Sequence, residues 1–241
     1  MPRIVFGVHP IRELLRARPE DVERLHYAPR AGHGVGELVA EAEARGVRVR
    51  RAEHDQLRRL AEGGVHQGVV AEVAEYRYAD LEGLLEKREE TPPLLVLLDS
   101  VEDPHNLGAI VRSAHALGAN GVVIPQDRAV GVTAVVAKAS AGAIERCPIA
   151  RVVNLSRAID QIKEAGLWVA AAEPEGERPL WDADLRGPLA LVVGAEGQGI
   201  RPLVRRHCDL SLRIPMGARL GSLNASAAAA IALYEVARQR R

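Results

Sequence analysis

The sequence predicts an α/β protein in two blocks, the second of them an open parallel sheet with helices on both faces. Six short apolar runs between residues 94 and 215 alternate with helical stretches, as expected for strands that are buried on both sides. Before residue 76 the runs are shorter, which predicts a small separate α/β module. A charged stretch, 76–92, lies between the blocks and ends in prolines, as domain boundaries often do.

In the first block, residues 1–75, the apolar residues form short runs. Three runs are predicted strands: VERLHYAP (22–29), VRVRRAE (47–53) and GVVAEV (68–73). Two stretches have the spacing of amphipathic helices: IRELLRAR (11–18) and GELVAEAEARG (36–46). Gly46 stands where a glycine typically ends a helix. The stretch 76–92 is predicted to be a linker with a short helix.

The second block, residues 93–241, repeats a strand followed by a helix. Its predicted strands are LLVLLD (94–99), GVVIP (121–125), ARVVN (150–154), LWVAAAE (167–173), LALVVGAE (189–196) and LSLRIP (210–215). Its predicted helices cover 107–118, about 132–145, 155–166, 200–207 and about 222–240. Ligands of such sheets bind beyond the carboxyl ends of the strands, so function is sought in those loops.

Composition places the chain among globular proteins. Of its 241 residues 47% are hydrophobic, and no apolar run approaches the roughly 18 residues of a membrane-spanning helix. The first residues show no signal-peptide pattern, so we expect a cytoplasmic protein without a membrane partner. Basic and acidic residues balance at 32 each, which argues against a non-specific nucleic-acid binder, and no DNA partner is expected. Cys147 and Cys208 are far apart, which predicts two buried thiols rather than a disulfide or zinc site.

The loop and helix after the strand at 94–99 contain two polar residues of interest. Asn106 lies near the helix start and suits either an N-cap or a ligand contact. Arg112, two turns later among small and apolar neighbours, suits either a solvated face or an anion site. Asp103 and His105 alone are too few for a metal site, so no metal is predicted.

The loop after the strand at 189–196 is rich in glycine. Gly194, Gly197 and Gly199 allow a ligand to approach the backbone closely and allow positive φ angles. Their spacing is not the G-x-G-x-x-G of dinucleotide-binding folds, and no G-K-[ST] occurs, which excludes a P-loop. Glu196, inside the turn, is either a turn carboxylate or a hydrogen-bond acceptor that orients a ligand.

The last loop joins a strand end at Ile214-Pro215-Met216 to a helix that begins ASAAAA. Ser222, Leu223 and Asn224 precede that helix, and Ser222 also suits its N-cap. The small side chains of the helix allow another backbone or helix to approach closely.

Together the three loops resemble the three signature motifs of the SpoU (TrmH-like) family of RNA ribose 2′-O-methyltransferases. Asn106 and Arg112 match the first motif. The G-x-E-G-x-G of the second motif falls on 194–199, and the I-P-M and S-L-N-x-S of the third fall on 214–216 and 222–226. The motifs occur in the family's order, no motif position departs from the pattern, and the resemblance covers about 92–241.

The resemblance implies a C-terminal parallel-sheet α/β domain with a deep trefoil knot at 93–241. FGVHPIRELL near the start and VHQGVVAEV at 65–73 resemble the small RNA substrate-binding domain of one branch, which implies that role for 1–75. That branch includes enzymes that methylate guanosine in 23S rRNA, and the leading interpretation is that this chain acts on a loop of the peptidyl-transferase domain. The resemblance therefore implies this reaction and this RNA partner.

The resemblance also implies S-adenosylmethionine as the cofactor and a homodimer as the assembly. The implied cofactor-binding residues are Gly194, Gly199, Ile214, Met216 and Leu223, and the implied catalytic residues are Arg112, Asn106, Glu196, Ser222 and Asn224. In the family the arginine activates the ribose 2′-hydroxyl. Because a guanidinium stays protonated, an equally physical role is to hold an RNA phosphate and to stabilise the developing alkoxide.

Candidates for RNA contact in the first block are His9, Arg12, His66 and Gln67. Other interpretations stay open: the same chemistry on another rRNA loop or on tRNA, a non-catalytic RNA-binding or ribosome-assembly protein, and a small-molecule methyltransferase. The N-terminal module argues against tRNA and small molecules. The complete set of motif residues argues against a non-catalytic protein.

Overall fold

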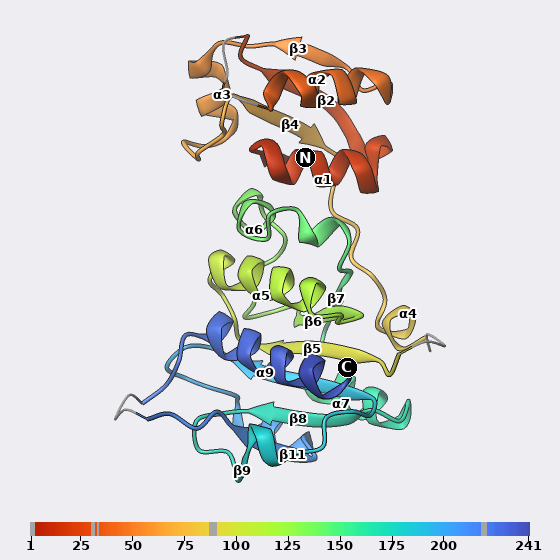
Figure 1. Cartoon of the computed structure of the whole chain (residues 1–241), viewed down its shortest axis with the longest axis vertical. Helices are drawn as coiled ribbons and strands as arrows, with labels where there is room; N and C mark the ends of the chain where they lie inside the picture. Colours follow the sequence, from red (N-terminus) through yellow and green to blue (C-terminus); the bar gives the residue numbers. More distant parts are fainter. Residues whose placement is uncertain (1–2, 30–31, 33, 87–90, 218–220) are drawn as a thin grey trace. The chain divides into compact units, whose positions relative to one another are not determined.

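The chain folds as two units, each built around its own sheet (Figure 1). The computed structural model describes residues 3–29, 32, 34–86, 91–217 and 221–241. The first unit contains residues 1–77 and 131–146, and the second contains 78–130 and 147–241. Within the described ranges, no helix is long and apolar enough to span a membrane.

A parallel sheet forms the centre of the second unit, with the strand order β7-β6-β5-β10-β8-β11-β9. Its strands are β5 (Leu94–Asp99), β6 (Gly121–Pro125), β7 (Ile149–Val152), β8 (Trp168–Ala172), β9 (Arg178–Pro179), β10 (Leu189–Gly194) and β11 (Leu210–Arg213). Six of these are the predicted apolar runs, so the parallel α/β class is confirmed. The short edge strand β9 was not predicted.

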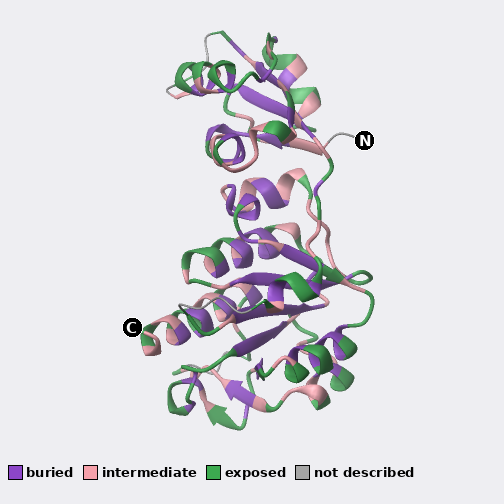
Figure 2. Ribbon diagram, turned by 90° about the vertical axis from the view of Figure 1, so that its right-hand side faces the viewer, coloured by how far each residue is buried: buried purple, intermediate pink, exposed green. Residues whose placement is uncertain are grey.

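Helices cover both faces of this sheet, as Figure 2 shows in the lower part of the view. They are α4 (Leu81–Leu85), α5 (Pro104–Ala116), α7 (Leu155–Glu164), α8 (Pro202–His207) and α9 (Ala225–Gln239), and a 3₁₀ turn, η3, covers Leu180–Asp182. Alternate strand residues such as Leu95, Leu97 and Val192 pack with α4, α7 and α8 in one apolar cluster. On α9 a row of small and apolar residues is buried, and α9 packs along α5. Every residue of β5 and β6 is buried, which explains their uninterrupted apolar sequence.

The first unit is a mixed four-stranded sheet with the order β1-β4-β2-β3. Its strands are β1 (Arg3–Phe6), β2 (Val22–Tyr27), β3 (Val49–Arg51) and β4 (Val69–Val73), of which only β2 and β3 pair in parallel. Its helices are α1 (Val8–Ala17), α2 (Val35–Ala44) and α3 (His54–Leu60), with a 3₁₀ turn, η1, at Pro19–Asp21. The sequence did not predict β1 or α3, since β1 is four residues long and α3 buries only Leu57.

The segment 131–146 belongs to the first unit, whereas the predicted boundaries assign it to the block 93–241. It contains α6 (Ala134–Ala139) and the 3₁₀ turn η2 (Ala143–Glu145). The single helix expected at about 132–145 is broken after Ala139, because Ala141 and Gly142 have φ angles of +51° and +87°.

A buried ion cluster attaches this segment to the first unit. The Glu145 carboxylate, 1% exposed, accepts hydrogen bonds from the guanidinium groups of Arg3, at 2.9 Å, and Arg18. Both guanidinium groups lie over the Tyr76 ring, at 5.5 and 5.7 Å from its centroid. Arg3 and Glu145 are 142 positions apart, so no local pattern could have indicated this packing.

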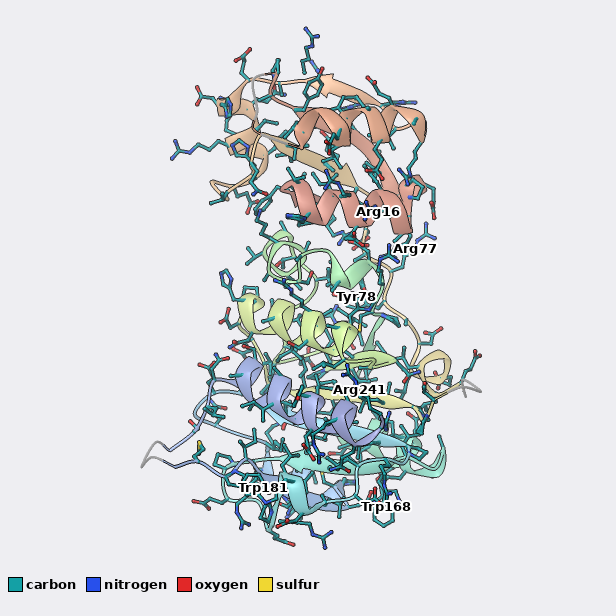
Figure 3. All side chains as sticks on the ribbon, viewed as in Figure 1. Arg16, Arg77, Tyr78, Trp168, Trp181 and Arg241 are labelled. Carbon is teal, nitrogen blue, oxygen red and sulfur yellow. The ribbon has the colours of Figure 1, made fainter. Side chains whose placement is uncertain are left out.

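We predict that Glu145→Gln lowers the free energy of unfolding of the first unit by about 3 kcal/mol, because the buried Arg3 guanidinium loses its counter-charge and Arg18 keeps only Asp21, at 3.6 Å. Urea unfolding followed by far-UV circular dichroism measures this effect. Tryptophan fluorescence would not, because Trp168 and Trp181 both belong to the second unit (Figure 3). The exposed Glu43→Gln serves as the control. Equal stability of the two variants would contradict the assigned role of Glu145.

Candidate active site

Three loops meet at the carboxyl edge of the second unit's sheet. Because β5, β10 and β11 run in parallel, the loops that follow them leave the sheet at one edge. Gly194, the last residue of β10, pairs in register with Asp99, the last residue of β5. The motif residues of the three loops are therefore brought to one place.

A triangle of hydrogen bonds joins the three loops. Asn106 donates from Nδ2 to Oε1 of Glu196 at 3.0 Å. Asn224 donates from Nδ2 to Oδ1 of Asn106 at 2.9 Å and also to Oε1 of Glu196. Asn106 is buried, whereas Glu196 and Asn224 are exposed. The Asn106 side chain is therefore held inside the protein, while a ligand can reach the other two side chains.

Helix caps orient two of these three side chains. Asp103 is the N-cap of α5, since its Oδ1 accepts from the backbone N–H of His105, and this places Asn106 in the first turn. Asn224 is the N-cap of α9 and accepts at Oδ1 from the backbone N–H groups of Ser226 and Ala227. Asp103 and Asn224 are thus the N-caps of α5 and α9. The sequence had left that role open for Asn106 and Ser222, and neither of them takes it. The Asp103–His105 pair is accounted for as a helix cap.

The glycine loop after β10 makes a tight turn. The Gly199 N–H donates to the Ala195 carbonyl at 2.9 Å, and Gly197 and Gly199 have φ angles of +76° and +65°. A Cβ at Gly194 would stand 2.2 Å from the carbonyl carbon of Gly199. Only glycine fits at position 194, because the returning backbone occupies the space of a side chain.

An ion pair between a buried carboxylate and a partly exposed arginine holds the same loop onto β5. The Asp99 carboxylate, fully buried at the end of β5, accepts from the backbone N–H and from Nε of Arg201, both at 2.7 Å. This bidentate arrangement satisfies both carboxylate oxygens and fixes the end of the glycine loop. Neither Asp99 nor Arg201 was among the site residues predicted from the sequence. The available signal was an aspartate that closes an otherwise apolar strand.

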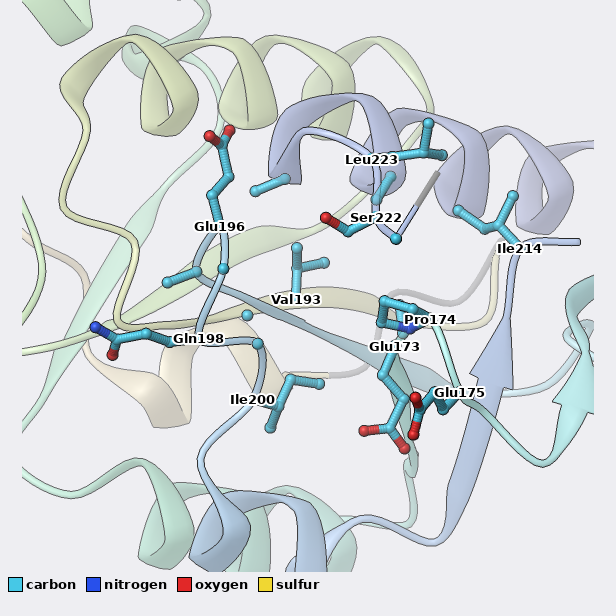
Figure 4. A pocket seen from close by; sticks show the side chains of 18 of the residues that line it. Glu173, Pro174, Glu175, Val193, Glu196, Gln198, Ile200, Ile214, Ser222 and Leu223 are labelled. Atoms are coloured by element: carbon cyan, nitrogen blue, oxygen red, sulfur yellow. The ribbon is translucent and has the colours of Figure 1, made fainter. Parts of the chain in front are cut away.

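A cavity of about 660 Å³ lies among these loops. Figure 4 shows its apolar wall, which includes Val193, Ile200, Ile214 and Leu223, with Glu173 and Glu175 at one side and Glu196 at the other. All five residues expected to bind a cofactor line it: Gly194, Gly199, Ile214, Met216 and Leu223. Ser222 lines it too. The loop 173–175 after β8 also contributes, although the sequence analysis did not select it.

The charge of this cavity is negative. Glu173, Glu175 and Glu196 line it, and no Lys or Arg does so among the residues that the structure places there. Glu173 also accepts hydrogen bonds from Arg205 and Ser211, and its carboxylate raises the pKa of Arg205. Such a surface favours a ligand with positive charge and disfavours polyphosphates.

A second cavity of about 330 Å³ adjoins the first. It is lined by polar residues from the loop after β5, including Glu102, and by Arg128 and Arg201. The residues that line both cavities are Ala195, Glu196, Gln198 and Ala225. Glu196 is the only ionisable side chain among these four shared residues.

Arg112 does not join the triangle. It lies on the exposed face of α5, seven residues after His105 and therefore on the same side of the helix. Across the residues described, it has neither a hydrogen bond nor an ion pair, and it lines neither of the two cavities. Its guanidinium is available to an anion from outside this chain.

The four candidates for RNA contact in the first unit fall into two groups. His66 and Gln67 line a cavity of their own. Arg12 lies 3.5 Å from Glu37 and 4.0 Å from Glu41, so its charge is already partnered, and His9 is exposed on α1.

The two cysteines offer no nucleophile. Cys147 is buried, as expected, but Cys208 is only half-buried, which corrects the prediction of two buried thiols. Burial raises the pKa of Cys208 to about 12, so the thiol stays protonated at neutral pH.

Comparison with known proteins gives consistent matches. Residues 93–234 match the SpoU rRNA Methylase family, and residues 4–79 match a domain described as RNA 2′-O ribose methyltransferase substrate binding. An uncharacterized tRNA/rRNA methyltransferase of Synechocystis is 46% identical over 84% of this chain and 53% of its own length. The 23S rRNA (guanosine-2′-O-)-methyltransferase RlmB of Yersinia pestis is 41% identical over 100% of this chain and 98% of its own.

A solved structure matches both units. The SpoU methyltransferase AviRb from Streptomyces viridochromogenes, in complex with the cofactor AdoMet, aligns with a TM-score of 0.82 and 30% identity. The alignment covers 98% of this chain and 90% of AviRb.

We predict that Asp99→Asn loosens the glycine loop, because Arg201 loses its buried counter-charge. Hydrogen–deuterium exchange at the Arg201 N–H should accelerate, and the melting temperature of the protein should fall. Asp127→Asn, at an exposed position, provides the control. Unchanged exchange in the loop of Asp99→Asn would be inconsistent with this role.

Proposed function

The chain belongs to the SpoU rRNA methylase family, and we propose that it methylates the ribose 2′-hydroxyl of a guanosine in 23S rRNA. It is an RNA 2′-O-methyltransferase that uses S-adenosylmethionine. The observation that carries the proposal is the convergence of the three motif loops on one cavity, with Glu196 at its border with a second. The proposed place of action is the cytoplasm, where the rRNA substrate is found.

The first cavity suits the cofactor in size and charge. Its volume of about 660 Å³ lies within the range of small-molecule sites, and its carboxylates match a ligand that carries a positive sulfonium. The backbone of Gly194 and Gly199, together with Ile214, Met216 and Leu223, would hold S-adenosylmethionine. When bound, this cofactor supplies an electrophilic methyl group.

The second cavity is the proposed place of the acceptor nucleotide. A ribose 2′-hydroxyl is a poor nucleophile and must lose its proton as it attacks. The Glu196 carboxylate borders both cavities, and its Oε1 accepts from two amides. We assign Glu196 the acceptance of this proton, Asn106 and Asn224 the orientation of the carboxylate, and Ser222 a contact near the methyl donor.

We propose that Arg112 acts through the positive charge of its guanidinium. Its exposed guanidinium, without a partner in the described part of the chain, is suited to an RNA phosphate. A phosphate held there would bring the ribose toward the Arg112 guanidinium, whose positive charge would stabilise the developing alkoxide. This assignment avoids a deprotonated guanidinium.

The target and the assembly complete the proposal. The relative RlmB, which this chain matches over its whole length, is named for guanosine in 23S rRNA, and this supports the same substrate here. A deep trefoil knot in residues 93–241 and a target loop in the peptidyl-transferase domain are carried over from the family resemblance. The homodimer is supported by the exposed apolar residues Ile231 and Tyr234 on α9.

The reaction is tested by incubating the purified chain with labelled S-adenosylmethionine and unmodified 23S rRNA, followed by mass spectrometry of nuclease fragments. The expected result is a single 2′-O-methylguanosine in the peptidyl-transferase domain. Label in tRNA transcripts or in another rRNA loop would keep the chemistry and overturn the target. Cofactor binding without transfer to any RNA would contradict the proposed reaction.

Gly194→Ala should weaken S-adenosylmethionine binding at least about tenfold, because the added Cβ displaces the Gly199 backbone that lines the cavity. Isothermal titration calorimetry measures the dissociation constant. Gly187→Ala is the matched control, since a Cβ there meets no atom within 4 Å. Equal affinities of the two variants would exclude the glycine loop as the cofactor site.

Arg112→Ala should lower kcat about 100-fold and leave cofactor affinity unchanged, because it removes one charge at the transition state and lies outside the cofactor cavity. The exposed Arg157→Ala controls for a general loss of positive charge. Near-normal turnover of Arg112→Ala would remove Arg112 from the mechanism.

Sedimentation velocity should find a dimer at micromolar concentration. Replacing both Ile231 and Tyr234 by Asp should give monomers, since charge would then be buried in the proposed interface. A monomeric wild-type chain would contradict the dimer.

A further inference from the structure

A separate cavity of about 610 Å³ lies in the first unit, and the activity proposed above does not use it. It is formed by the loop 63–68 between α3 and β4, by the start of α3 and by the start of α1. Its lining residues are Val8, Gly32, His54, Arg58, Gly63, Gly64, Val65, His66, Gln67 and Gly68.

The loop of this cavity is held in one conformation. Gln67 has a φ of +55°, and its Oε1 accepts from the Val8 N–H at 3.2 Å and from Nζ of Lys138 at 3.0 Å. A Cβ at Gly64 would stand 2.5 Å from the Phe6 ring, so the loop packs closely on the core at that point. The cavity is therefore largely formed before any ligand arrives.

Two imidazole rings form its aromatic surface. The rings of His54 and His66 lie 5.7 Å apart between centroids and are tilted by 47°. Nδ1 of His66 accepts from the Gly68 N–H, which leaves the proton of the neutral ring on Nε2. Burial and the neighbouring His54 lower the pKa of His66, so this ring is mainly neutral at pH 7. Neutral histidine is one of the side chains on which unpaired nucleobases stack.

The charge of the cavity is positive. Arg58 lines it, and its guanidinium forms no ion pair among the residues described, although Asp55 and Glu62 line a neighbouring cavity with it. The residues that line it include no Asp or Glu. The Lys138 ammonium donates a hydrogen bond to Oε1 of Gln67, which lines the cavity. The side chain of Val65 is exposed at the surface. Aromatic rings beside an unpartnered guanidinium match a base and its phosphate.

We propose that this cavity binds one unpaired nucleotide of the RNA substrate, with the base against His54 and His66 and a phosphate on Arg58. This inference adds a binding site to the proposed function. It rests on that function only for the identification of the ligand as RNA. It would hold the RNA at a point distinct from the methylated ribose, so it contributes to affinity and not to the chemical step.

The test uses the full chain and a short fluorescein-labelled single-stranded RNA, with fluorescence anisotropy as the readout. Arg58→Ala should weaken RNA binding about tenfold and reduce the salt dependence of binding by about one phosphate contact. Arg59→Ala is the matched control, because it removes the same charge from the next residue of α3 and does not line the cavity. Its dissociation constant should equal that of the wild type.

Stacking is tested at His54, whose ring makes no hydrogen bond within the described ranges. His54→Ala should weaken binding about tenfold, and His54→Phe should restore it, because phenylalanine keeps an aromatic face. A duplex of the same sequence should bind more weakly than the single strand. Circular dichroism confirms that the variants, all at exposed positions, stay folded.

Three outcomes would overturn the site: wild-type affinity in Arg58→Ala, an equal loss in Arg59→Ala, or failure of His54→Phe to restore what His54→Ala loses. Methyl transfer to 23S rRNA, measured with the same proteins at saturating RNA, tests the proposed function separately from this binding site. A wild type that binds the labelled RNA through Arg58 but transfers no methyl group to 23S rRNA refutes the proposed function alone.

Discussion

The hydrogen-bonded triangle of Asn106, Glu196 and Asn224 is the constraint on which the active site depends. Each residue comes from a different loop, and the amide and carboxylate groups can meet only because β5, β10 and β11 present their carboxyl ends at one edge of a parallel sheet. The Asp99–Arg201 pair secures the glycine loop beneath the triangle. Loss of Glu196 or of Asn224 would leave the buried Asn106 amide without one of its two hydrogen-bond partners.

The triangle also separates two chemical environments. On one side lies a cavity with an apolar wall, glycine backbone and carboxylates, and on the other a smaller polar cavity with arginines. Glu196 borders both, so one carboxylate faces the place proposed for the methyl donor and the place proposed for the acceptor hydroxyl. The positive charge that we propose for the reaction, on Arg112, lies outside both cavities, so in this proposal the RNA brings a phosphate to it.

The sequence was sufficient to predict six of the seven strands of the parallel sheet, because strands such as β5 and β6 are buried on both faces and appear as largely apolar runs. It also selected the residues of the triangle and the lining of the cavity, through motifs whose spacing is local. Contacts between distant residues were not predictable in this way: Asp99 with Arg201, and Glu145 with Arg3, depend on packing that no local period encodes. Short elements such as α3, with one buried residue, were missed for a related reason, since they have too few apolar positions to form a pattern.

The most direct test of this account is a double-mutant cycle on kcat for methyl transfer, with Asn106→Ala, Glu196→Gln and the double variant, each at saturating cofactor and RNA. If Asn106 acts by orienting the Glu196 carboxylate, the double variant should lose no more than Glu196→Gln alone, because an oriented group that is already absent cannot be lost twice. If the two losses instead multiply, Asn106 and Glu196 act independently and the triangle is not the unit that positions the catalytic carboxylate.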